Sequence, residues 1–189
     1  MSKVKFNLVG NTFTHLTNGN KGYSVHGKES KYIEWVGDDG EGTFYIDNTI
    51  NQGIVDKKDG PKYLWLLESR FIKPGLVESI IDNREAVEDA YETIFTHDQR
   101  LLALGDKYKW CPAQGFWIKD PKVYEKSKMI SMIASNKNMC EGHRLRLEWV
   151  DRIGDQLDLY GRGFKEIADK EEGLCDYMFS VAIENGQYE

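Results

Sequence analysis

The sequence of 189 residues contains few of the residues that build disulfide-linked or metal-dependent domains. Its three cysteines, Cys111, Cys140 and Cys175, lie far apart and form no C-x-x-C pair, and its four histidines lack the spacing of metal ligands. We therefore expect reduced, mostly buried thiols in a reducing compartment, with no disulfide framework, no metal site and no bound cofactor.

Long apolar runs and an excess of positive charge are also missing. No stretch approaches the roughly 18 apolar residues that a membrane-spanning helix needs, and no signal peptide opens the chain. The net charge is -6, and the basic residues are scattered among acidic ones. The sequence therefore predicts a cytoplasmic protein that neither spans a membrane nor binds nucleic acid.

What the chain does have is enough apolar side chains for a globular fold, because 40% of its residues are hydrophobic. Residues 4–9 alternate as a strand does, and short strands are expected near 32–36 and 43–46. Residues 62–67 form an apolar run typical of a buried strand. Helical spacing follows over 76–91, then a strand at 93–96 and a short helix between Asp98 and Gly105.

A second block follows Asp120-Pro121. Its pattern predicts a strand at 128–134, a helix at 142–153, a strand at 157–160, a helix at 164–176 and a strand at 178–183. Both blocks have the alternation of strands and helices that is typical of parallel sheets. We therefore predict an α/β fold of two Rossmann-like units, with one domain at 1–121 and a partial one at 122–189.

The residues that follow the strands of a parallel sheet share one edge, and ligands bind at that edge. In the first block these residues are Glu68-Ser69 and His97-Asp98. In the second block they are Ser135-Asn136, Gly161-Arg162-Gly163 and Glu184-Asn185. Two such edges that face one another would form a ligand-binding cleft between the domains.

Arg144 and Arg146 stand in the first turns of the helix predicted at 142–153. Guanidinium groups and the helix dipole together suit a diphosphate at this place. The alternative is a solvated helix face, on which the arginines pair with Glu148 or Asp151. The glycines on either side of Arg162 likewise allow either a close approach to a phosphate or a plain turn.

Glu68 follows a buried strand, at a position where a carboxylate can serve as a general base. The alternative is a surface carboxylate that pairs with Arg70 or Lys73. His97, at the next strand end, is a rival base. Glu184-Asn185 could bind the hydroxyl groups of a ribose or sugar, although asparagine is also common after strands.

Taken in order, the second block resembles glycosyltransferase family 10, which contains the α-1,3/1,4-fucosyltransferases. The donor domain of that family has a strand ending in S-N, an arginine-bearing helix, a V-D-x-Y/F-G strand and a Y-K/M-F strand ending in E-N. The matching parts here are Ser135-Asn136, 142–146 (G-H-R-L-R), 157–162 (L-D-L-Y-G-R), 176–179 (D-Y-M-F) and 183–185 (I-E-N). The resemblance covers residues 126–189, and a looser similarity to the acceptor domain appears at 66–69 and 95–98.

The resemblance implies a GT-B glycosyltransferase that moves a sugar, usually fucose, from a GDP-sugar donor to a glycan acceptor with inversion. Arg146, or Arg144 in an ungapped match, would hold the donor diphosphate, and Asn185 would contact the donor sugar or nucleotide. Glu68 would match the base that deprotonates the acceptor hydroxyl. The expected donor site also includes Ser135, Asn136, Gly161 and Glu184.

The family pattern continues after Glu184-Asn185 with Y-x-T-E-K, an apolar helix and a further strand, whereas this sequence ends at Glu189. We therefore expect a truncated or shortened donor domain, and activity that depends on a longer form. We also expect a homo-oligomer joined through the unpaired sheet edge. Two other hypotheses stay open, which are a non-catalytic binding or assembly module that keeps the fold and an unrelated nucleotide-binding α/β protein.

Overall fold

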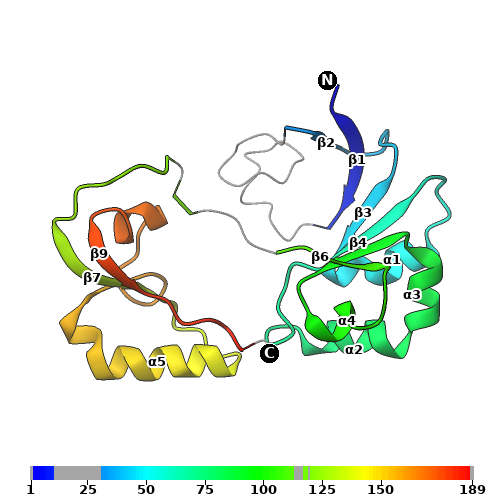
Figure 1. The fold of residues 1–189 in the computed structure, drawn as a ribbon. Helices are drawn as coiled ribbons and strands as arrows, with labels where there is room; N and C mark the ends of the chain where they lie inside the picture. The colour runs from blue at the N-terminus through cyan, green and yellow to red at the C-terminus, as the bar shows by residue number, and fades with distance from the viewer. Residues whose placement is uncertain (1, 11–30, 113–116, 119, 188–189) are drawn as a thin grey trace. The chain divides into compact units, whose positions relative to one another are not determined.

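The structure is a computed structural model that describes residues 2–10, 31–112, 117–118 and 120–187 (Figure 1). The chain divides into two compact units, the first within Met1–Gly115 and the second within Phe116–Gln187. The sequence pattern places this boundary after residue 121. Each unit carries its own parallel sheet, and each is described by itself below.

The first unit is built on a sheet of six described strands, all parallel, in the order β2-β1-β3-β4-β5-β6. The strands are β1 (Val4–Val9), β2 (Ile33–Val36), β3 (Thr43–Ile46), β4 (Lys62–Trp65), β5 (Thr93–Thr96) and β6 (Tyr108–Trp110). The described helices are η3 (Asp47–Thr49), α1 (Ile50–Val55), α2 (Pro74–Asp82), α3 (Arg84–Ala90) and α4 (Gln99–Leu102). The strand order reverses between β1 and β3, which makes that point the topological switch point of the sheet.

One face of this sheet forms the hydrophobic core with the helices (Figure 1). A row of paired residues crosses four strands of that face, and it consists of Tyr45, Leu64, Ile94 and Tyr108. The helices contribute Ile50, Leu76, Val77, Ile80, Val87 and Leu101, all of them buried. This packing fixes β3 to β6 in register, so the loops that follow these strands emerge from a rigid base.

The alternate positions of the same strands carry an aromatic cluster on the opposite face. Six rings from five neighbouring strands contact one another at centroid distances of 4.8 to 6.5 Å. They belong to Phe6, Trp35, Phe44, Tyr63, Trp65 and Phe95. Because side chains alternate between the two faces of a strand, the aromatic residues and the core row follow from one pattern of sequence.

The second unit has three described strands, all parallel, in the order β8-β7-β9. Its elements are β7 (Lys128–Ile133), α5 (Glu141–Ile153), η4 (Gly154–Gln156), β8 (Asp158–Tyr160), η5 (Lys170–Gly173) and β9 (Tyr177–Val181). Tyr160 and Tyr177 join the outer strands through their hydroxyl groups, which lie 2.6 Å apart. Met178 and Phe179 are exposed on β9, an edge strand, and self-association through this edge stays a prediction.

The predicted α/β class is confirmed in both units, since each contains a parallel sheet with helices. Every predicted strand is present within one or two residues of its expected position. The helical spacing over 76–91 belongs to two helices, because Asn83 leaves the helical conformation between α2 and α3. The sequence pattern does not predict α1 or β6, which are only six and three residues long.

The helix predicted at 164–176 is wrong. Within this range the structure has only η5, and a bridge pairs Lys165 with Tyr160. A capping box explains the difference, because Asp169 accepts a hydrogen bond from the Glu171 amide while the Glu172 carboxylate accepts one from the Asp169 amide. A helix can therefore start only after Asp169, and Gly173 follows within one turn.

All three cysteines are free thiols, with Cys140 and Cys175 buried.

Candidate functional site

The loop after β4 carries Glu68 at the carboxyl edge of the six-stranded sheet. The amides of Leu67 and Glu68 donate to one oxygen of Asp47 at 2.8 and 3.2 Å. Asp47 follows β3 directly, so the neighbouring strand holds the start of the loop. The loop then turns on Ser69, whose carbonyl accepts hydrogen bonds from the amides of Ile72 and Lys73. The main chain around Glu68 is therefore ordered by bonds from two sides.

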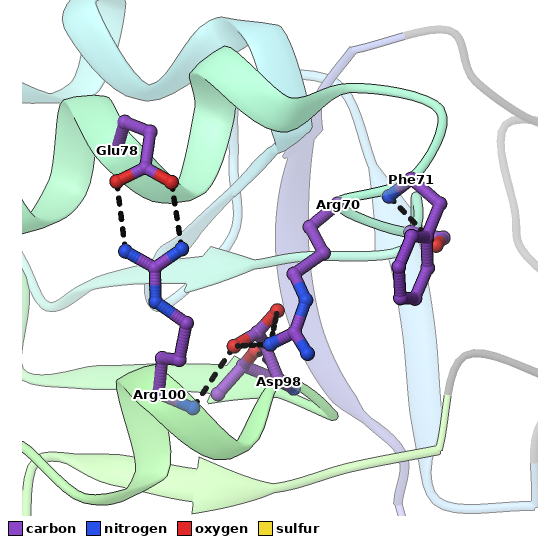
Figure 2. A network of polar contacts seen from close by, with 7 residues as sticks. Arg70, Phe71, Glu78, Asp98 and Arg100 are labelled. Carbon is purple, nitrogen blue, oxygen red and sulfur yellow. Dashed lines mark hydrogen bonds and ion pairs between the residues drawn. The ribbon is translucent and has the colours of Figure 1, made fainter. Parts of the chain in front are cut away.

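The strand on the other side, β5, holds the same loop through an ion pair. Arg70 Nη1 lies 3.1 and 3.2 Å from the two oxygens of Asp98, as Figure 2 shows. Only 4% of the Asp98 side chain is exposed, and it also accepts a hydrogen bond from the Arg100 amide at 3.0 Å, which caps α4. A second pair in Figure 2 joins Arg100 of α4 to Glu78 of α2 at 2.6 and 2.8 Å.

The carboxylate of Glu68 makes no hydrogen bond or ion pair to any residue that the structure describes. Sequence reasoning left open a surface pairing with Arg70 or Lys73. The structure excludes it, because Arg70 pairs with Asp98 and Lys73 Nζ lies 3.6 Å from Asp47. Glu68 is half-buried at the edge, and His97 is half-buried at the next strand end. The site therefore presents an unneutralised carboxylate on an ordered loop.

In the second unit, α5 brings Arg146 to the end of β9. Its Nη2 donates to the carbonyl oxygen of Ile183 and lies 3.4 Å from the amide oxygen of Asn185. The helix also contacts this segment at Gly142, whose amide donates to the Asn185 carbonyl at 3.2 Å. A Cβ at Gly142 would overlap the carbonyl oxygen of Glu184. The match that sequence reasoning gave to Arg146 and Asn185 thus corresponds to a direct contact.

The ends of β7 and β8 meet at the same edge of the second sheet. Gly161 has a φ of 110°, a conformation that suits glycine, and a Cβ there would overlap the carbonyl oxygen of Ala134. The Asn136 amide donates to the Arg162 carbonyl at 3.0 Å. Ser135 is half-buried beside them. The loops after β7 and β8 therefore pack closely on each other.

Asn136, Arg144 and Glu184 are the three predicted donor-site residues that lie exposed. Neither Arg144 nor Arg146 forms an ion pair with a described residue, so the alternative of helix-face pairs with Glu148 or Asp151 is not observed. Arg146 is half-buried, and Arg144 belongs to the solvent-exposed side of α5. The geometry favours Arg146 over Arg144 as the arginine that is held in place at the strand end.

Two further cationic or ionisable side chains surround Arg146. The buried His143 accepts a hydrogen bond on Nδ1 from the Met139 amide at 3.1 Å, and burial together with the Arg146 and Lys137 charges lowers its pKa. Burial and the Arg146 charge also lower the pKa of Lys170, whose Nζ lies 3.3 Å from the centre of the Trp117 ring. The charge of Arg146 therefore acts on both His143 and Lys170.

Sequence reasoning missed two of these residues, Asp47 and Lys170. Asp47 could have been found by the rule that identified Glu68, because it directly follows the strand 43–46. The indistinct pattern before residue 60 hid it. Lys170 lies inside the range wrongly predicted as a helix, where the capping sequence D-K-E-E was the available signal for a local start at Asp169.

Comparison of the chain with protein-family models, with curated proteins and with solved structures found no match. Among the described residues, no group of three or more His, Cys, Asp or Glu side chains is arranged to hold a metal ion, and His15 and His26 lie outside those residues. None of the helices in the described part of the chain combines the length and apolarity that crossing a bilayer requires.

The two arginine–carboxylate pairs of Figure 2 differ in burial, which predicts different costs of breaking them. Arg70→Met should lower the free energy of unfolding by about 1–3 kcal/mol, because it leaves the buried Asp98 carboxylate short of a charged donor. Arg100→Met removes an exposed partner and should change stability little. Urea denaturation measures both, and equal losses would contradict the view that Arg70 anchors the loop.

The lowered pKa of His143 predicts a pH dependence of stability. The unfolded chain binds a proton at His143 more readily than the folded chain does, so stability is complete above about pH 6.5 and falls as the pH drops below it. His143→Asn keeps an acceptor for the Met139 amide but does not titrate. The melting temperature of the wild type should therefore fall more between pH 7 and pH 5 than that of the variant. Parallel curves would show that His143 does not contribute.

Proposed function

We propose that the chain is a glycosyltransferase that moves a sugar, fucose by resemblance, from a GDP-sugar to the hydroxyl group of a glycan, with inversion. The observation that carries this proposal is the contact of Arg146 with Asn185 at the end of β9. If the two matches were coincidental, as in an unrelated nucleotide-binding protein, the resemblance would not place these residues together. The proposal includes a GT-B arrangement, in which the first unit binds the acceptor and the second binds the donor.

On the acceptor side, Glu68 is the proposed general base. Its carboxylate takes the proton of the acceptor hydroxyl, and the freed oxygen forms a bond to the anomeric carbon of the donor. The bond from that carbon to the β-phosphate oxygen breaks with its electron pair going to the diphosphate, so the attack from the opposite side inverts the anomeric centre. The absence of a neutralising cation at Glu68, among the described residues, supports this role.

On the donor side, Arg146 is proposed to stabilise the charge that develops on the departing diphosphate. Lys170, whose pKa the Arg146 charge lowers, would add a second positive charge. Asn185 and Glu184 would bind hydroxyl groups of the donor, and Ser135, Asn136 and Gly161 would line the diphosphate. Arg144, which is exposed, would contribute long-range positive charge only.

A second candidate is a module that binds a nucleotide sugar or assembles with a partner without catalysis. The observation that favours it is the bond from Arg146 to the Ile183 carbonyl, because this arginine already has a structural partner. The two candidates share a donor site but differ at Glu68, which only the transferase needs.

Donor binding tests both candidates. Calorimetry should detect binding of GDP and GDP-fucose to the folded chain, and Arg146→Ala should weaken it by about 10–100-fold through the loss of charge-assisted hydrogen bonds. Arg152→Ala, in the last turn of the same helix, is the matched control and should bind normally. A folded wild-type chain that binds neither nucleotide would contradict the donor site.

Acceptor chemistry separates the transferase from the binding module. Glu68→Gln keeps the size of the side chain but cannot take a proton, so it should leave nucleotide binding unchanged and slow sugar transfer by about 10²–10⁴-fold. Transfer to a panel of oligosaccharides is measured by release of GDP. A chain that binds GDP-fucose, but transfers equally well with glutamine at this position, would not use Glu68 as its base.

A further inference from the structure

The bend that follows β3 contains a strained residue. Asp47 has a φ of 44°, and it is the one non-glycine residue with a positive φ in the described part of the chain. It is also almost fully buried, with 1% of its surface exposed. A left-handed aspartate persists only where its surroundings hold it, and such strain gathers at functional sites. The side chain shows what this conformation achieves.

The carboxylate of Asp47 ties together both ends of the loop that carries Glu68. One oxygen accepts hydrogen bonds from the amides of Leu67 and Glu68, at 2.8 and 3.2 Å. The other lies 3.6 Å from Nζ of Lys73, at the far end of the loop. The two amides are consecutive, so together they fix the direction of the peptide that leads into Glu68.

The Glu68 carboxylate has no hydrogen bond or ion pair to a described residue, and among the described hydrogen bonds only those to Asp47 hold the Glu68 amide itself. We propose that Asp47 is the positioning residue of the candidate site, which sets the direction of the Glu68 side chain through its main chain. This inference rests on the proposed function for its catalytic consequence. Lys73 balances the buried charge of Asp47.

Three substitutions separate the effect of the Asp47 hydrogen bonds from the effect of its positive φ. Asp47→Asn retains an acceptor oxygen and tolerates the left-handed conformation. Asp47→Ala removes the oxygens and keeps the strain, whereas Asp47→Gly removes both. Val87→Ala is the matched control, because it opens a cavity in the core of the same unit without touching the loop.

The first measurement is amide hydrogen exchange at Leu67 and Glu68. Both amides should exchange about tenfold faster or more in Asp47→Gly and Asp47→Ala than in the wild type. Asp47→Asn should stay close to the wild type. If Val87→Ala accelerates these two amides as much as Asp47→Gly does, at equal global stability, Asp47 is merely structural and the inference is overturned.

The second measurement is sugar transfer. Asp47→Gly should lower kcat in the manner of Glu68→Gln while the KM for the acceptor changes little, and Asp47→Asn should restore most of the rate. A lowered rate in Asp47→Gly that Asp47→Asn does not restore would overturn the positioning role. If no form transfers sugar although the exchange result holds, the proposed function fails and the hold of Asp47 on the loop stands.

Discussion

Asp47 and Asp98 are buried at the ends of β3 and β5, and they determine which ion pairs form in the loop after β4, the strand between them. A cation stabilises a buried carboxylate, and the segment after β4 supplies one to each of them. Arg70 is therefore drawn to one side and Lys73 to the other. Glu68 precedes both of them in the sequence and pairs with neither. The Glu68 carboxylate therefore lacks an ion pair because Arg70 and Lys73 pair with the two buried aspartates.

The core of the first unit makes this arrangement possible. Asp47 and Asp98 can hold one loop from both sides only if β3, β4 and β5 keep a fixed register. That register is set by the row of buried side chains that faces the helices, since a slip of one residue would turn the row toward the aromatic face. Packing far from the edge therefore determines which charges meet at the edge.

The sequence was sufficient for the strands but not for the pairs at their ends. An apolar run such as 62–67 can be recognised within a few consecutive residues, and this predicts a strand. Glu68 was found because it follows such a run. The partner of Arg70 lies 28 residues away, so no local pattern distinguishes Asp98 from Glu68 as its partner. Short elements such as α1 and η5 form because of tertiary contacts and caps. In α1, for example, the Tyr91 hydroxyl donates to the Ile50 carbonyl at 2.6 Å.

The bond from Arg146 to the Ile183 carbonyl bears on the choice between transferase and binding module. A guanidinium group has five N–H donors, and the bonds to Ile183 and Asn185 involve only Nη2. The remaining donors can still meet phosphate oxygens. Anchoring also removes rotamer freedom before a ligand arrives, which is the condition under which a charge stabilises a leaving group without reorganising. The structural bond therefore leaves Arg146 able to take the proposed diphosphate role, so it does not by itself argue for a module without catalysis.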